Sequence, residues 1–304
     1  MEKIRKIFKN ERFLLLLFAV PFVVFIFMFA YVPLFGWAYA FLNYRPGIPL
    51  SNTPFVGLYN FRLIFTFYSR QVLAALRNTL VFAGLGIAFS WLPMVFAIFL
   101  NEIRSVKFKR LTQTLTTLPN FISWVIVFSL AFAMFNTHGL VNQLLLRFNI
   151  IETPTMLLGN VNAVYIFQTM LGWWKGMGWA AIIYIAAITG IDSELYDAAS
   201  VDGAGRFARM WYITFPGLLP TYLVLLILGI GNILSVGFEQ YFVFQNPMTA
   251  PRIEVIDVFV YRVGLLNRDF SFATAVGISR SFISITLLFA ANLIAKKIRG
   301  HEII

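Results

Sequence analysis

Three charged side chains lie inside apolar stretches of this chain, where their type and position could serve a chemical purpose. They are Lys175, Glu239 and Arg280. If these stretches are membrane helices rising 1.5 Å per residue, Lys175 and Arg280 lie near mid-membrane, where a charge costs at least ~2.5 kcal/mol on insertion scales. Such charges face a cavity or a partner, and we expect Glu239 to be the counter-ion. A polar solute path and a purely structural ion network are both open.

Groups that suit a polyhydroxylated ligand surround these charges. Aromatic rings offer flat faces and amides offer paired donors and acceptors, a combination found in small-molecule sites. The candidate solute-path residues are Gln168, Trp173, Trp174, Lys175, Asn232, Glu239, Gln240, Tyr241 and Arg280. If the two cations outweigh Glu239 at the cavity, an anionic sugar such as a uronate oligomer would suit the path.

Enzymatic chemistry finds no support in the residue types. The chain has no cysteine, and its two histidines, His138 and His301, lie far apart, which argues against thiolate nucleophiles and zinc sites. The sequence also contains no Gly-x-x-x-x-Gly-Lys-[Ser/Thr] phosphate loop. We therefore expect no catalytic residues, no metal site and no cofactor bound by this chain.

Membrane-spanning helices are the elements that must position these residues. Apolar residues make up 60% of the chain and charged residues only 12%, far from the averages of soluble proteins. A helix needs about 20 apolar residues to cross the bilayer core. The predicted spans lie near residues 13–42, 78–100, 114–135, 161–189, 221–245 and 270–295. The expected fold is an all-α integral membrane protein, one transmembrane domain over residues 1–304, with kinks at Pro21, Pro33, Pro93 and Pro119.

Basic residues flank these spans mainly on one side. They are Lys3, Arg5, Lys6, Lys9 and Arg12 before the first span, Arg104, Lys107, Lys109 and Arg110 after the second, and Lys296, Lys297 and Arg299 after the sixth. Positive charge beside a span marks the cytoplasmic face, so both termini and the loop of residues 190–220 should be cytoplasmic. The net charge of +11 is thus an orientation signal, and nucleic acid is not an expected partner.

The longest stretch without a hydrophobic run begins at Glu194 and ends at Pro220. Asp192 or Ser193 should cap a helix there, because a side-chain oxygen at that position accepts from the first amides. Acidic residues in the first turn suit the helix dipole. The small side chains of Ala198 and Ala199 give this helix a face that another protein could approach closely.

Glycines should end this short helix, since Gly203 and Gly205 are poor helix formers. Residues 206–215 could form a second, amphipathic helix along the membrane surface, closed by Pro216. The pair would make a docking knob on the cytoplasmic side. A helix that merely lies among the lipid headgroups is the alternative that the residues leave open.

A spaced motif within this loop resembles a known family. It reads Asp197-Ala198-Ala199, three residues, Gly203, nine residues, then Ile213-Thr214-Phe215-Pro216. This is similar to the EAA-x3-G-x9-I-x-L-P loop of permease subunits in bacterial ABC importers, with Asp197 in place of Glu and Phe215 in place of Leu. Asp202-Gly203-Ala204, Pro220, Gly57-Leu58-Tyr59-Asn60-Phe61, Trp174-Lys175 and Gly237-Phe238-Glu239-Gln240 resemble its maltose-permease-like carbohydrate branch, in particular the oligosaccharide and polysaccharide-fragment permeases.

The resemblance implies a role and a set of partners. In that family the loop between spans four and five is a coupling helix seated in a separate ATPase subunit, and the matching residues here are Glu194, Asp197, Ala198, Ala199, Asp202 and Gly203. It implies a second homologous permease forming a heterodimer, two ATPase subunits that bind ATP and Mg, and an extracytoplasmic sugar-binding protein meeting outer loops near residues 43–77 and 246–269. The expected function is ATP-driven import of oligosaccharides, acidic ones among them, across the bacterial cytoplasmic membrane.

Two other classes of function would require different features of the sequence. An ion-coupled secondary sugar transporter would need intramembrane carboxylates and inverted repeats, whereas this chain offers Glu239 and no visible repeat. A membrane scaffold without transport would have no need of charges inside its spans.

Overall fold

The computed structural model describes residues 11–299 and the side chains of residues 15–293. The basic residues Lys3, Arg5, Lys6 and Lys9, together with His301, lie outside the described part. The cytoplasmic position of the two termini therefore stays a prediction.

Helices make up almost all of the regular structure. Within residues 11–299 the β pairing is confined to an isolated bridge between Leu42 and Phe55. Six helical segments of the described chain are long and apolar enough to cross a membrane: Leu15–Phe41, Ser69–Asn101, Trp124–Arg147, Val164–Ile188, Arg206–Gly231 and Phe270–Leu293. The predicted fold class, an all-α membrane protein with six spans, is confirmed.

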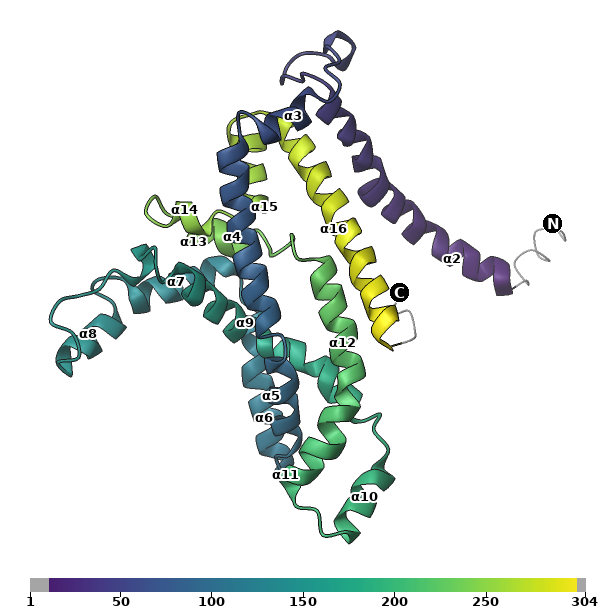
Figure 1. Ribbon diagram of the computed structural model, residues 1–304, viewed down its shortest axis with the longest axis vertical. Helices are drawn as coiled ribbons and strands as arrows, with labels where there is room; N and C mark the ends of the chain where they lie inside the picture. Colours follow the sequence, from purple (N-terminus) through teal and green to yellow (C-terminus); the bar gives the residue numbers. More distant parts are fainter. Residues whose placement is uncertain (1–10, 300–304) are drawn as a thin grey trace. The chain divides into compact units, whose positions relative to one another are not determined.

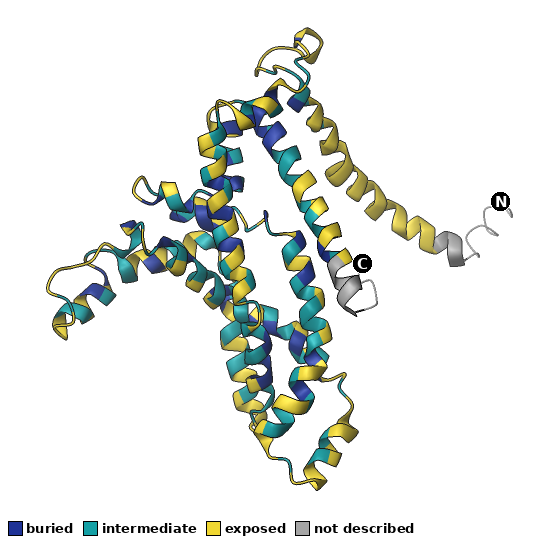
Figure 2. Cartoon of the chain, viewed as in Figure 1, coloured by how far each residue is buried: buried dark blue, intermediate teal, exposed yellow. Residues whose placement is uncertain are grey.

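The described chain divides into two compact units, one of which comprises the residues up to Ser69 and Val260–Ser279. It holds helix α2 (Glu11–Ile26), the π-helix η1 (Phe27–Tyr31), the 3-10 helices η2 (Val32–Phe41) and η3 (Leu50–Asn52), α3 (Tyr59–Phe65), the π-helix η7 (Arg262–Leu266) and the start of α16 (Phe270–Arg299). Figure 2 shows α2 exposed along the part whose burial is described. A helix that is apolar all round is typical of a membrane span.

Asn60 holds together the turn between η2 and α3. Its buried amide nitrogen donates to the carbonyls of Ala40 (2.9 Å) and Leu42 (3.1 Å), which joins α3 to the end of η2. Gly57, three residues earlier, has a φ of +57°, a conformation that side chains disfavour. The Gly57–Phe61 motif thus has a structural role in a tight turn.

The other unit comprises Arg70–Phe259 and the residues from Arg280 onward. Its helices in chain order are α4 (Ser69–Ala88), α5 (Leu92–Asn101), α6 (Val106–Thr117), η4 (Leu118–Phe121), α7 (Trp124–Phe135), α8 (Leu140–Arg147), η5 (Leu157–Gly159), α9 (Val164–Ile188), α10 (Ser193–Val201), α11 (Arg206–Arg209), η6 (Met210–Thr214), α12 (Phe215–Gly231), α13 (Glu239–Phe244), α14 (Ala250–Ile253) and α15 (Ile256–Tyr261). Figure 1 shows α10 beyond the ends of α9 and α11, in the connection between them.

Proline breaks two of the spans where kinks were expected. The second span is interrupted between α4 and α5, with Pro93 in the first turn of α5. Pro119 lies in η4, between α6 and α7. Pro21, by contrast, lies inside the continuous helix α2. Proline removes one backbone donor, so each break must find other partners for the freed carbonyls.

The fifth span differs from the prediction. Residues 206–215 do not form a separate surface helix closed by Pro216, because α11, η6 and α12 follow one another without a break from Arg206 to Gly231. Pro216 follows directly after the π-helix η6, and the run stays helical there although proline has no N–H to donate. At the other end the helix stops at Gly231 and resumes only at Glu239, so residues 221–245 are not one helix.

A tight apolar core joins α5, α9 and α12. Buried Met94 and Ala97 of α5 pack with Ala181 and Tyr184 of α9 and with Leu218 of α12. Nearby, α9 passes so close to the end of α6 that a Cβ atom on Gly178 would lie 2.2 Å from the carbonyl oxygen of Thr116. Only glycine fits this crossing.

This crossing generates a prediction. Gly178→Ala should lower the apparent Tm of the purified protein in detergent, since overpacking against backbone typically costs about 1–3 kcal/mol. Gly176→Ala is the matched control, because a Cβ atom there meets nothing within 4 Å and alanine favours a helix. Thermal unfolding followed by tryptophan fluorescence checks both. Equal Tm values for the two variants would contradict the close approach.

Candidate functional site: the loop helix and a cavity among the spans

The predicted loop helix is present as α10, and its cap is Asp192. The side-chain Oδ1 of Asp192 accepts from the backbone N–H of Glu194 at 2.9 Å. Glu194 lies in the first turn, where its charge suits the positive end of the helix dipole. The predicted cap and the acidic first turn of this helix are therefore confirmed.

Gly203 ends α10 in a Schellman motif. The amide of Ala204 donates to the carbonyl of Ala199 at 2.8 Å, and the amide of Gly203 donates to that of Ser200 at 3.2 Å. This pattern needs a left-handed residue at the turn, and Gly203 has a φ of +75°. The expectation that glycine stops the helix is confirmed, with its conformational reason.

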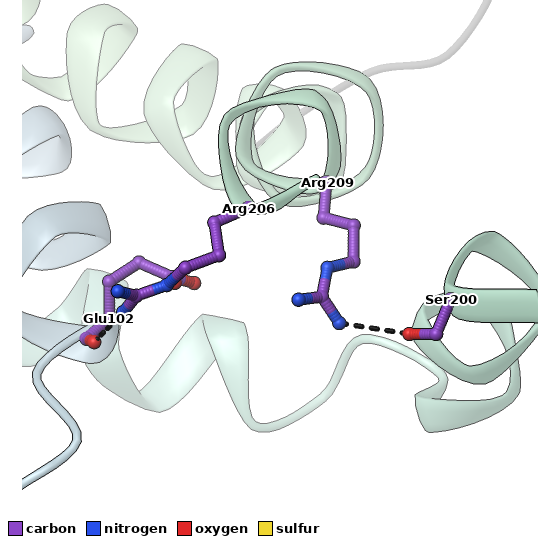
Figure 3. A network of polar contacts seen from close by, with 4 residues as sticks. All are labelled: Glu102, Ser200, Arg206 and Arg209. Atoms are coloured by element: carbon purple, nitrogen blue, oxygen red, sulfur yellow. Dashed lines mark hydrogen bonds and ion pairs between the residues drawn. The ribbon is translucent and has the colours of Figure 1, made fainter. Parts of the chain in front are cut away.

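Side chains fasten α10 to the helical segment that follows it. Arg209 donates through Nη1 to Ser200 Oγ at 2.9 Å, and the hydroxyls of Tyr196 and Thr214 lie 2.9 Å apart. Figure 3 shows Arg209 reaching Ser200, while Arg206 reaches Glu102. The loop helix is thus held at both turns rather than suspended on a flexible linker.

The six residues predicted to contact a partner are gathered on α10 and its final turn. All of them except partly buried Ala199 are exposed. Large apolar side chains lie beside them, with Leu195 52%, Val201 88% and Phe207 78% exposed. Solvent-facing apolar groups grouped around one helix indicate an interaction surface.

A cavity of about 460 Å³ lies among α4–α5, α9 and α12. Its polar lining groups are Ser90, Tyr184, Tyr222, Asn232 and Ser235. The hydroxyls of Ser90 and Tyr222 are 3.1 Å apart. A smaller cavity of about 240 Å³ shares Ser90 in its lining and adds Trp173. Size and lining, mainly apolar with a few polar groups, are typical of small-molecule sites.

Only two predicted path residues line these cavities. They are Asn232 in the larger and Trp173 in the smaller. Asn232 donates to the carbonyl of Leu228 at 2.9 Å, and Trp173 packs edge-on against Phe89 with centroids 4.4 Å apart. Trp174 is 43% exposed on the same helix.

Gln168, Gln240 and Tyr241 lie together, buried in the core. The Gln240 amide nitrogen donates to the backbone carbonyl of Gln168 at 2.7 Å and to its side-chain oxygen at 2.9 Å. Tyr241 packs against Phe82 with centroids 4.5 Å apart. These contacts join α9 to α13 and give the three residues structural partners.

The expected counter-ion arrangement is wrong. Lys175 is buried and donates through Nζ to the carbonyl of Asn120 at 2.7 Å, with its charge 5.4 Å from the Trp124 ring centroid. The amine thereby satisfies a carbonyl at the break between α6 and α7.

Arg280 is likewise not paired with Glu239. It forms an ion pair with Asp257 at the start of α15, whereas Glu239 is exposed in the first turn of α13. The sequence predicts Glu239 late in a continuous fifth span over residues 221–245, but the chain is not helical from Ile233 to Phe238. After that break Glu239 lies exposed at the start of α13.

Sequence reasoning missed the hydroxyl groups of the cavity and the partner of Arg206. Ser90 carried a usable signal, because it lies three residues before a proline inside an apolar run. Glu102 and Arg206 carried none, since residues so far apart in sequence meet only through the packing of α5 against α12.

The fold and these sites define a multi-pass membrane protein with a helix presented on a loop between two spans and a cavity among the spans. Residues 94–300 match the model of the family described as the binding-protein-dependent transport system inner membrane component. The chain belongs to this family and is a multi-pass protein of the inner membrane.

Relatives of this chain align with it over nearly its whole length. The chain is 40% identical to the polygalacturonan/rhamnogalacturonan transport system permease protein YteP of Bacillus subtilis (strain 168), over 95% of this chain and 89% of that protein. It is 36% identical to protein LplB of the same organism, over 95% and 90% of the two chains.

Solved structures give the same relationship. A chain of a bacterial ABC transporter involved in the import of the acidic polysaccharide alginate superposes with a TM-score of 0.85 at 30% identity, over 98% of this chain and 100% of that one. A chain of the alginate transporter in complex with an alginate pentasaccharide-bound periplasmic protein also superposes with a TM-score of 0.85, at 31% identity over 98% of both chains.

The glycine turn generates a prediction. In Gly203→Ala a left-handed conformation is imposed on alanine, at a cost of about 1–2 kcal/mol, so the last turn of α10 should open more often. Peptides covering residues 193–204 should exchange amide hydrogen roughly fivefold faster. Gly205→Ala, where φ is −68°, serves as the control and should leave α10 protected. Unchanged exchange in Gly203→Ala would show that α10 does not depend on this turn.

Proposed function

We propose that this chain is the transmembrane subunit of an ATP-driven importer that moves oligosaccharides across the bacterial cytoplasmic membrane. The observation that carries the proposal is α10, a capped and braced helix presented between the fourth and fifth spans, in a chain of the binding-protein-dependent transport family. A second observation is the cavity among the spans that flank it.

The substrate class is inferred from the relatives. One relative is described as a permease for polygalacturonan and rhamnogalacturonan, and a structural neighbour imports alginate, an acidic polysaccharide. We infer that the solute of this chain is an oligosaccharide rich in uronic acid. The described cavity has a neutral lining that suits sugar hydroxyls. The carboxylates of the solute would therefore bind to groups outside this cavity.

The motor of the importer is another chain. α10 is proposed to bind in a groove of an ATPase subunit through Asp197, Ala198 and Ala199. The exposed apolar side chains of Leu195 and Val201, on the same helix, would extend this contact. ATP and Mg would be bound by two such ATPase subunits, and this chain would hold no cofactor and catalyse no hydrolysis.

Two further partners complete the proposed assembly. A second, homologous permease would form a heterodimer with this chain and close the solute path. An extracytoplasmic sugar-binding protein would deliver the solute to outer loops near residues 43–77 and 246–269. A structural neighbour is in complex with a periplasmic protein carrying an alginate pentasaccharide, which supports this delivery route.

The cavity is the proposed solute path. Asn232 and the hydroxyls of Ser90, Tyr222 and Ser235 would bind sugar hydroxyls, and Trp173 would offer a ring face in the adjoining cavity. Lys175 and Arg280 are satisfied by Asn120 and Asp257, so we assign them to the framework of the path rather than to its lining.

Contact of the loop helix with an ATPase distinguishes this proposal from an ion-coupled secondary transporter. Because the chain has no cysteine, Ala199→Cys introduces a single thiol. We expect this thiol, in cells expressing the neighbouring genes, to crosslink to an ATPase subunit in a manner that changes with bound nucleotide. Arg147→Cys, on α8, is the matched control and should give no such product. Cytoplasmic labelling of Ala199→Cys without any crosslinked partner would favour the ion-coupled transporter.

The cavity assignment generates a separate prediction. Asn232→Ala should reduce the uptake of oligogalacturonate by about 2- to 10-fold, the effect of one lost hydrogen bond, while assembly of the complex and basal ATP hydrolysis persist. Gln143→Ala removes an amide from α8, away from the cavity, and should leave uptake at the level of the unmodified chain. Initial rates of uptake into proteoliposomes are measured for both variants and the unmodified chain. Equal rates for Asn232→Ala and the unmodified chain would show that Asn232 does not line the path.

A further inference from the structure

Backbone connections reach only two of the three walls around the larger cavity. α9 ends at Ile188 and α10 begins at Ser193, while α11 begins at Arg206 and runs on into α12. A displacement of α10 therefore reaches α9 and α12 through short stretches of chain. The third wall, formed by α4 and α5, ends about ninety residues before α10 in the sequence, and no such connection joins it to the loop.

Arg206 contacts the end of this third wall. α5 ends at Asn101, and Glu102 is its C-cap. Arg206 donates through Nε to Glu102 Oε2 at 3.1 Å and through Nη2 to the backbone carbonyl of the same residue. Carbonyls at a helix C-terminus lack partners within the helix, and a cation there suits the dipole. One guanidinium thus holds both the side chain and the main chain of Glu102 (Figure 3).

We propose that Arg206 and Glu102 act as positioning residues, forming a link through which α5 moves together with α10. This inference rests on the proposed function, since it assigns to the pair a share of the coupling between ATP hydrolysis and the solute path. The link would give all three walls of the cavity an attachment to the loop helix.

The attachments on the loop side of the link are stiff. Residues 202–205 separate the end of α10 from Arg206, and they include the Gly203 turn. Arg209, one turn after Arg206, is hydrogen-bonded back to Ser200. Arg206 therefore cannot shift far without α10.

On the other side, α5 is packed as a rigid element. Its buried Met94, Ala97 and Ile98 belong to the core shared with α9 and α12. Pro93, in its first turn, lines both cavities. A displacement of Glu102 at the end of α5 would therefore also displace the part of the cavity wall that α5 forms.

The exposure of the pair separates this role from a purely stabilising one. The side chains of Arg206 and Glu102 are 43% and 28% exposed, and exposed ion pairs contribute little to folding. Breaking the pair should leave the fold and the assembly intact. The change should appear in how efficiently hydrolysis drives uptake.

Charge reversal tests the link in the complete importer complex reconstituted in proteoliposomes. Arg206→Glu and Glu102→Arg should each lower the oligogalacturonate taken up per ATP hydrolysed by about fivefold or more, the range of typical coupling effects. The double variant should recover part of the ratio, because the ion pair returns while the bond to the backbone carbonyl does not. Arg110→Glu, an exposed charge reversal on α6, is the control and should leave the ratio unchanged.

Three outcomes would overturn the inference. Single variants with an unchanged ratio would show that the pair transmits nothing. A double variant no better than the single ones would show that the residues act separately. Loss of the ATPase crosslink at Ala199→Cys in Arg206→Glu but not in Glu102→Arg would place Arg206 in the ATPase contact instead.

The unmodified complex distinguishes this inference from the proposed function. If it hydrolyses ATP without uptake of any uronate or neutral oligosaccharide, the proposed function fails and the link loses its role. If it couples the two and only the charge reversals have no effect, the proposed function stands and the link alone is wrong.

Discussion

The need to satisfy every backbone polar group without water governs this structure. In a bilayer that need restricts spanning segments to helices, and irregular backbone survives only where the protein supplies partners. Side chains serve three of the breaks between helices within residues 11–299. Ser90 and Trp91 donate to the carbonyls of Ile87 and Ala88 where α4 gives way to α5. Lys175 donates to Asn120 between α6 and α7, and Asn232 donates to Leu228 at the end of α12.

Two of these breaks, at Ser90 and Asn232, line the larger cavity. The residues that satisfy the backbone there therefore also shape the proposed solute path.

The charges inside the spans have a structural explanation that follows from the same need. Burying an unpaired charge is far more expensive than burying a satisfied one. Lys175 has a carbonyl acceptor and an aromatic ring, and Arg280 has the carboxylate of Asp257. A sugar path built on this framework can be lined by hydroxyls and amides. Lys175 satisfies a carbonyl at the break between α6 and α7, and Arg280 joins α16 to α15.

The loop between the fourth and fifth spans is held by its own hydrogen bonds in a way that suits the transmission of movement. α10 has an aspartate cap at its start and a Schellman turn at its end, and Arg209 joins it to the helix that becomes the fifth span. Conformational coupling requires that an element have a defined position in each state. A loop helix held on both sides can be displaced as a unit, whereas a flexible loop would absorb the displacement.

The sequence by itself determined the membrane class, the six spans, the loop helix with its cap and its glycine stop, and the family to which the chain belongs. The family follows from the resemblance of a spaced motif, and the other features depend on composition, on periods of a few residues and on local backbone preferences, all of which are visible within short windows. It did not determine the partners of Lys175, Glu239 and Arg280, the continuity of the helix through Pro216, or the meeting of Glu102 with Arg206. Each of these depends on where a helix pauses and which distant segment packs beside it. The non-helical residues 233–238 show why. One interruption in an apolar run changes the direction of every side chain after it, and only the tertiary structure decides where that interruption falls.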